Sequence, residues 1–169
     1  MLDHFAMMAD YNAWANAKLY QAASELDEAD LNADRGAFFG SLFGTLSHLL
    51  VTDRIWMHRF TGEGPTHKTL TEQPYSTLAE LDAARRSEDD RIIAWVQGLT
   101  SDDIERVFTY SPISVPGAIS QRLAPTLSHV FNHQTHHRGQ AHMTLTALGR
   151  PSLSLDLIYY LRSDGQRWQ

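Results

Sequence analysis

One segment in the last third of the chain is bounded by signals for the start and the end of a helix. Pro125 suits the first turn of a helix, Gly149 suits the position after its end, and Pro151 prevents continuation. Five of the nine histidines lie between them, and four of the five fall within nine residues, at positions 129, 133, 136 and 137. Residues four apart share one helix face, so His133 and His137 can reach one metal ion from the same side. The segment therefore predicts a helix that carries two candidate metal ligands.

Other parts of the chain show the apolar spacing of three and four residues that marks a buried helix face. With the segment above, the expected helices run from about Asp3 to Leu26, Ser41 to Phe60, Thr77 to Leu99 and Pro125 to Leu148. Ser41 is an expected N-cap and Gly62 an expected stop, while Thr77 and Glu80 form a capping-box pattern. A short fifth helix is expected at 155–161. These patterns predict an all-α protein.

Two connections between the expected helices are long. Residues 62–76 contain two glycines and two prolines and are expected to form a loop. Residues 101–124 contain two short apolar runs, 107–110 and 115–119, which can pair as a small hairpin, although two prolines weaken that prediction. Long connections in a compact domain often border a functional site.

Length and composition restrict the class of protein. The 169 residues suit one domain, expected to span 1–169, and no apolar run approaches the roughly 20 residues of a membrane span. A formal charge of −6 without a basic cluster argues against nucleic-acid binding. With no cysteine, any metal must use nitrogen or oxygen ligands. The first residues lack a signal-peptide pattern, which favours a cytoplasmic protein.

A third ligand must come from outside the histidine-rich helix. His129 cannot share an ion with His137, because eight residues rise about 12 Å and a metal–nitrogen bond measures about 2 Å. His48 is the best candidate, because a helical projection places apolar residues on both of its flanks. His142 falls on the opposite face of its helix and is expected to be exposed. His4, His58 and His67 are interpreted as surface residues.

Several polar residues near these positions have open roles. Asn12 interrupts an apolar helix face and is expected to form a hydrogen bond that aligns helices. Asp53 projects about 140° away from His48, and Arg138 about 140° away from His133, so neither is expected to face the metal. Gln140 projects close to His133, where it is either a hydrogen-bond partner that orients a ligand or simple packing. No catalytic side chain is assigned.

The chain resembles the DinB family, also called DinB/YfiT-like, over nearly its whole length. The similar segments are 11–16 on the first helix, 39–48 leading into 53–60, 129–140 with its His-His-Arg-Gly-Gln motif, and 155–161. The resemblance implies a four-helix bundle with long crossover connections. It also implies one divalent metal held by three histidines, which map to His48, His133 and His137. Zinc and nickel are the leading candidates.

The resemblance further implies a homodimer, which fits aromatic residues expected on the helix surfaces, such as Trp14, Tyr20 and Trp95. Some members of the family resemble thiol-dependent enzymes, including mycothiol-dependent maleylpyruvate isomerase and bacillithiol S-transferases. Others are described as metal-dependent hydrolases. The other expected partner is a small-molecule substrate.

Three functions are therefore in competition. Three nitrogen ligands leave a coordination position open, as in catalytic zinc sites. The first function is a transferase or isomerase in which the metal activates a low-molecular-weight thiol cosubstrate. The second is a hydrolase that uses metal-bound hydroxide, and it lacks an evident carboxylate base. The third is a non-catalytic metal-binding stress-response bundle.

Overall fold

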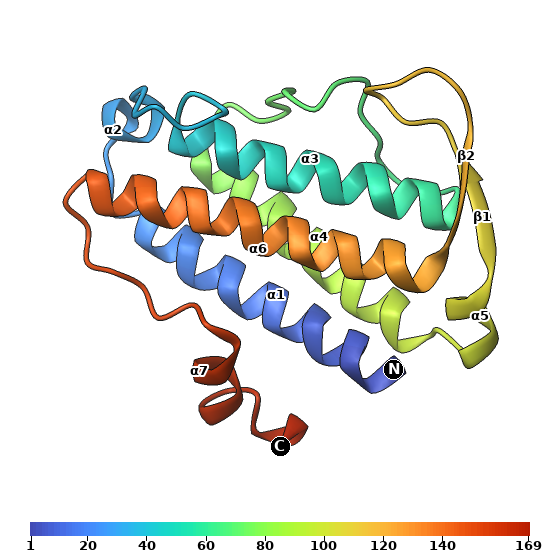
Figure 1. Cartoon of the computed structure of the whole chain (residues 1–169). Coiled ribbons are helices and arrows are strands. Elements are labelled where there is room, and N and C mark those ends of the chain that lie inside the picture. The colour runs from blue at the N-terminus through green and yellow to red at the C-terminus, as the bar shows by residue number, and fades with distance from the viewer.

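Four long helices form a bundle in the computed structural model, which describes all residues 1–169 (Figure 1). They are α1 (Leu2–Ala23), α3 (Leu42–Thr61), α4 (Leu78–Gln97) and α6 (Leu123–Ala147). Six shorter elements complete the fold: α2 (Glu28–Asn32), α5 (Ser101–Glu105), β1 (Val107–Tyr110), β2 (Ile119–Arg122), α7 (Leu157–Arg162) and the 3-10 helix η1 (Gln166–Trp168). The all-α prediction and its four-helix bundle are confirmed.

The predicted helix boundaries follow from local hydrogen bonds. The Ser41 hydroxyl accepts a bond from the Gly44 N–H at the start of α3, and Gly62 ends that helix at a φ of 76°. Thr77 and Glu80 form the expected capping box at the start of α4. Gly149 follows α6 at a φ of 78°, a conformation that favours glycine. The sequence therefore located these boundaries to within a few residues.

The first two long helices, α1 and α3, are not neighbours in this bundle. Both α1 and α3 pack mainly against α4 and α6, so α1 and α3 lie diagonally across the core. Figure 1 shows that α3 and α6 run antiparallel and that the connection from α3 to α4 returns along the length of the bundle. This is the expected long crossover. It places a loop over the α3 face that carries His48.

The sequence missed α2 and α5 and misplaced one strand. Each missed helix has five residues, too few for a periodic pattern, although Asp27 and Thr100 cap them through their side chains. The hairpin forms, but its second strand is 119–122 rather than 115–119. Both prolines lie in the hairpin loop, because proline cannot donate to a strand ladder.

The bundle core consists of two apolar clusters with a polar layer between them. One cluster gathers Leu19, Leu46, Leu50, Leu81 and Leu145, and the other gathers Phe5, Phe60, Ile92, Leu127 and Phe131. Asn12 lies in the layer between, where it donates to Asp89 on α4 and accepts from Arg138 on α6. The predicted hydrogen bond of Asn12 between helices is confirmed. None of the helices has both the length and the apolar character needed to cross a bilayer.

Candidate metal centre

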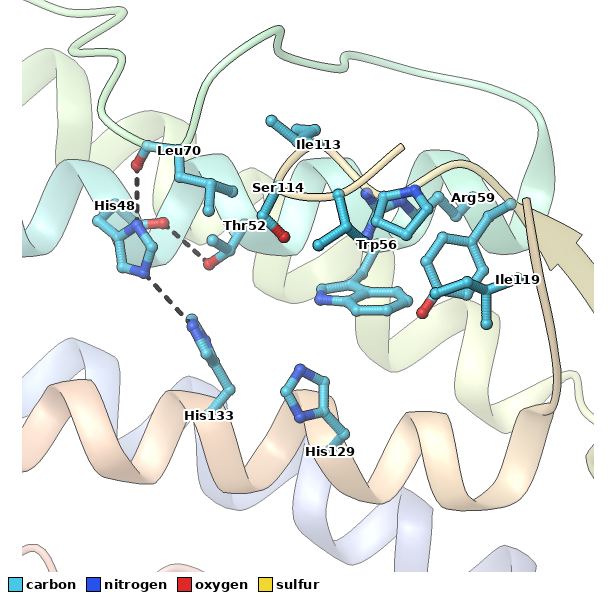
Figure 2. Close-up of a pocket in the computed structure, with 13 residues that line it drawn as sticks. His48, Thr52, Trp56, Arg59, Leu70, Ile113, Ser114, Ile119, His129 and His133 are labelled. Carbon is cyan, nitrogen blue, oxygen red and sulfur yellow. Dashed lines mark hydrogen bonds between the residues drawn. The ribbon is translucent and has the colours of Figure 1, made fainter. Parts of the chain in front are cut away.

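Three histidine side chains from two helices meet in the groove between α3 and α6. His48 lies on α3 and is 3% exposed, while His133 and His137 lie one turn apart on α6. One nitrogen from each ring can be chosen so that all three lie within 4.8 Å of one another. The Nε2 atoms of His48 and His133 are 3.3 Å apart, and Figure 2 shows these two rings facing each other across the groove. The group could hold a metal ion, as the helical spacing indicated.

Hydrogen bonds fix the orientation of two of the rings. His48 Nδ1 lies 2.8 Å from the carbonyl oxygen of Leu70, and His137 Nδ1 lies 2.8 Å from the amide oxygen of Gln140. A carbonyl oxygen only accepts, so each Nδ1 must carry the proton. Each Nε2 then has a free lone pair, which is the atom that a metal requires. Gln140 therefore has an orienting contact, but with His137 rather than with its projected neighbour His133.

The Leu70 carbonyl is held in place by a compact turn in the crossover loop. The Glu72 carboxylate accepts bonds from the backbone N–H groups of Lys68 and Thr69, at 2.7 and 3.0 Å, and from His67 Nδ1 at 2.8 Å. His67 was expected on the surface, but its side chain is only 8% exposed because it closes this turn. The turn positions a backbone atom that orients a candidate ligand.

The surroundings keep the candidate ligands in the neutral state that binds metals. Burial lowers the pKa of His48 to about 4, against an ordinary value of 6.5. Burial, and then the neighbouring His137 and His48, lower the pKa of His133 to about 3. Burial also lowers the pKa of His137, although its bond to Gln140 acts in the opposite direction. A divalent transition-metal ion suits this donor set, because neutral imidazoles offer free nitrogen lone pairs to a metal.

Phe39 forms an aromatic wall beside these rings. Its ring stacks on His48 at 3.7 Å between centroids, with planes 19° apart, and meets the edge of His137 at 5.4 Å. Phe39 precedes α3 in a turn that also exposes Phe38. Sequence reasoning did not identify Phe39 as part of the site, because helical geometry does not fix the direction of a side chain that lies outside a helix.

The remaining histidines of α6 lie outside the three-histidine group. His129 lies one turn before His133, and its ring packs against Trp56 at 5.5 Å between centroids. His136 is exposed and contacts Gln140. His142 was expected to be exposed, but it is half-buried and its Nε2 accepts the N–H of Leu153. The projection failed there because the chain after α6 folds back over that face.

Two charged residues point away from the histidines, as predicted. Asp53 forms an ion pair with Arg85 on α4 at 2.9 Å and accepts a bond from Gln134 at 2.6 Å. Arg138 contacts Asn12 and lies over the ring of Tyr11. Both belong to the polar layer of the bundle, so neither can act on a molecule bound at the histidines.

A cavity of about 330 Å³ opens beside His48 and His133. Thirteen residues line it, including His129, Thr52, Trp56 and Arg59, with Ile113 and Ile119 from the hairpin (Figure 2). None of the thirteen is acidic. The volume falls within the range of small-molecule sites. One exposed edge of the histidine group therefore faces a space that a small substrate can enter.

The α3 residues of this cavity had a sequence signal that was not used. His48, Thr52, Trp56 and Arg59 follow each other at intervals of four, four and three, so they share one helix face. The hairpin residues had no such signal. Their position depends on how the connection after α5 folds over the end of the bundle.

Comparison with known proteins gives the family. A sequence model of the DinB family matches residues 1–168. The chain is also 25% identical over 173 aligned positions to Protein DinB of Bacillus subtilis (strain 168), and the alignment covers 95% of each protein. The chain therefore belongs to the DinB family, as the motifs predicted.

Proposed function

We propose that this DinB-family protein binds one divalent transition metal through His48, His133 and His137 and uses it to activate a low-molecular-weight thiol for S-transfer or isomerisation. The observation that carries the proposal is the convergence of three neutral imidazoles beside an open cavity. Two of the rings are fixed in the tautomer that leaves Nε2 free. Zinc or nickel suits a set of three imidazole ligands.

The metal supplies one kind of chemistry when bound: it lowers the pKa of a coordinated thiol or water so that the ligand loses its proton near neutral pH. The chain's own residues do the rest. The turn at Leu70 and the amide of Gln140 orient the imidazoles, and Phe39 shields His48 from water. The hairpin loop and Trp56 enclose the cavity.

The absence of acidic residues from the cavity favours the thiol route over hydrolysis. Besides the metal, hydrolases of this kind usually use a general base, most often a carboxylate or an imidazole. Asp53, the carboxylate on the same helix as His48, is committed to Arg85. A thiol that ionises on the metal needs no such base. The chain has no cysteine, so the thiol would come from a cosubstrate.

One observation supports the hydrolase alternative. His129 lines the cavity without a hydrogen-bond partner, and burial lowers its pKa, which favours the neutral ring that can accept a proton. It lies one turn from His133 on the same face of α6. A hydrolase would use His129 as its general base.

Cobalt substitution separates these functions. Cobalt-loaded protein should develop a sulfur-to-metal charge-transfer band when the right thiol is added, and binding should strengthen as the pH rises because the thiolate is the ligand. His133→Ala should abolish the band, whereas His136→Ala should keep it. If a panel of cellular thiols leaves the spectrum of metal-loaded protein unchanged, the thiol proposal is wrong. Hydrolysis that depends on His129 would then support the alternative, and no turnover at all would support a non-catalytic bundle.

The partner proposal is a homodimer. Exposed apolar side chains on α6 and α7, including Met143, Ile158 and Tyr159, support it, since such residues often mark contact surfaces. The aromatic residues that motivated the prediction do not, because Tyr20 is 2% exposed and Trp14 packs against Tyr160. Light scattering that gives a monomer mass at micromolar concentration would remove this proposal. A cytoplasmic location likewise stays a prediction.

A further inference from the structure

Arg59 stands apart from most arginines of this acidic chain because no carboxylate lies within 4.0 Å of it. Arginines that do pair with a carboxylate are Arg35, Arg54, Arg85, Arg86, Arg91, Arg122, Arg150 and Arg167. Arg59 instead lines the cavity beside the candidate metal centre, where none of the surrounding residues is acidic. The cation in this position has no carboxylate partner in the protein.

The guanidinium of Arg59 is held between two aromatic rings. It lies 4.5 Å from the ring centroid of Trp56 and 4.6 Å from that of Tyr110. One of its Nη2 protons is donated to the carbonyl oxygen of Ser111 at 3.3 Å. Stacking fixes the plane of a guanidinium and leaves its N–H edge free to donate. A guanidinium has five N–H donors, and most of those of Arg59 have no protein acceptor.

This arrangement carries a cost unless an anion binds. The side chain is half-buried, and burial lowers its pKa, although Tyr110 acts in the opposite direction. No acidic residue lines the cavity to compensate the positive charge. A charge taken partly out of water is stabilised most by an ionised hydrogen-bond acceptor. A carboxylate matches the planar fork of a guanidinium with two parallel hydrogen bonds. The free edge of Arg59 is therefore suited to a carboxylate.

Arg59 and the histidines lie at different positions along the same cavity. Arg59 follows His48 by 11 residues on α3, a rise of about 16 Å, and 11 residues return to nearly the same face of a helix. Figure 2 shows His48 and His133 towards one end of the cavity, Arg59 towards the other, and Trp56 between them. The intervening wall includes Ile113 and Ile119. A molecule that reaches both ends must be elongated and partly apolar.

We propose that Arg59 is the specificity-determining residue of this cavity and binds a carboxylate at one end of an elongated substrate or thiol cosubstrate, whose reactive end lies at the histidines. The inference deepens the proposed function and rests on it only for the reactive end. The carboxylate end depends on Arg59, Trp56 and Tyr110 and does not require that the metal bind sulfur.

Matched pairs of linear thiols test this assignment. One member of each pair is an ω-mercaptoalkanoate and the other is the ω-mercaptoalcohol of the same length, over a series of increasing chain lengths. Binding to cobalt-loaded protein is measured by calorimetry, and the charge-transfer band reports separately whether sulfur coordinates. A charge-assisted double hydrogen bond predicts that, at the best length, the acid binds at least about tenfold more tightly than the alcohol.

Three variants show whether Arg59 causes the preference. Arg59→Gln should bring the acid-to-alcohol affinity ratio close to one. Arg59→Lys should keep part of the preference, since it retains the charge but not the planar fork. Arg162→Gln is the matched control: it removes one positive charge from an exposed arginine on α7, outside the cavity, and should keep the full ratio. Equal helical content and metal content in all variants confirm that the fold is intact.

The two possible failures are distinguishable. If acids and alcohols bind equally to wild type and both give the sulfur band, the assignment of Arg59 is wrong and the thiol proposal stands. A preference for acids that persists in Arg59→Gln also overturns it, because the carboxylate then binds elsewhere, including at the metal. If no thiol gives the band but acids still bind more tightly through Arg59, the thiol proposal is wrong and the carboxylate site stands.

Discussion

The polar layer and the three-histidine group both place polar side chains inside the bundle, yet they differ in charge balance. The polar layer pairs opposite charges: Arg85 bridges Asp53 and Asp89 at 2.9 and 3.0 Å. The histidine group gathers rings of one kind, and two of them turn free Nε2 lone pairs towards the others. The charges of the first group are compensated by its own members, whereas the second lacks a cation.

Burial of polar residues does not by itself indicate a functional site. Burial alone would lower the pKa of Arg85, but the carboxylates of Asp89 and Asp53 outweigh it and raise that pKa. The histidines have no such compensation, and their pKa values fall because burial dominates. The candidate metal centre differs from the polar layer because it lacks a charged partner, and not because it is more polar.

The largest expected effect is the loss of the cation from the polar layer. Arg85→Met would leave Asp53 and Asp89 buried without their partner, and removing one member of a buried ion pair costs about 3–5 kcal/mol. Urea unfolding of metal-free protein measures this free energy. Arg86→Met is the control, since Arg86 is exposed and pairs with Asp82 on the same helix. It should cost less than about 1 kcal/mol. Similar losses of unfolding free energy in both variants would show that Arg85 is not an essential partner of Asp53 and Asp89.

The two groups should respond to pH with opposite signs in metal-free protein. The folded-state pKa values of His48 and His133 lie near 4 and 3, below 6.5, so the unfolded chain takes up protons first and stability is lost as the pH falls below about 6.5. Burial raises the pKa of Asp53 to about 6 from 3.8, so its contribution is lost as the pH rises from about 4 to 6.

Unfolding free energies measured between about pH 4 and pH 7 separate these contributions. Wild type should lose stability on acidification, His133→Ala should lose less, and Asp53→Asn should lose more because the opposing contribution is gone. An unchanged slope in His133→Ala would mean that the histidines do not set the pH response.

A smaller effect is expected at the residue that orients a ligand. Gln140→Ala removes the acceptor from His137 Nδ1 and should weaken metal binding by about 10–100-fold, the usual result of losing such a contact. Competition with a chromophoric chelator gives the affinity. His136→Ala, which removes the other partner of Gln140, should bind metal as wild type does. Full affinity in Gln140→Ala would leave that residue with a packing role only.

The smallest effect concerns the turn in the crossover loop. Glu72→Ala would release the backbone around Leu70 and so loosen the carbonyl that orients His48. We expect a weaker metal affinity by several-fold, less than for Gln140→Ala, because the loop retains its other contacts. Glu63→Ala, in the same connection and away from this turn, should have no effect. If the two variants behave alike, the turn does not position the carbonyl.

Much of the fold could be predicted because helix signals are local. Ser41, the Thr77–Glu80 box and Gly149 act on their own helices, and the sequence placed them correctly. The same is true of the i,i+4 pair of His133 and His137, whose facing depends only on helical geometry.

The parts that could not be predicted depend on tertiary packing. The Leu70 carbonyl is a backbone group positioned by a loop, so no residue type in the sequence indicates its contact with His48. Phe39 contacts His48 from a turn, where the direction of a side chain does not follow a helical period. The cation of Arg59 could be placed on the His48 face of α3, but its lack of a carboxylate partner appears only once the hairpin is folded beside it.

Metal content tests the candidate metal centre most directly. Elemental analysis of purified protein, after incubation with zinc or nickel and removal of free metal, should find about one ion per chain in wild type and in His136→Ala. His48→Ala should retain little, because the two histidines of α6 alone leave the group incomplete. A full complement of metal in His48→Ala would contradict the assignment of His48, His133 and His137 as a single metal site.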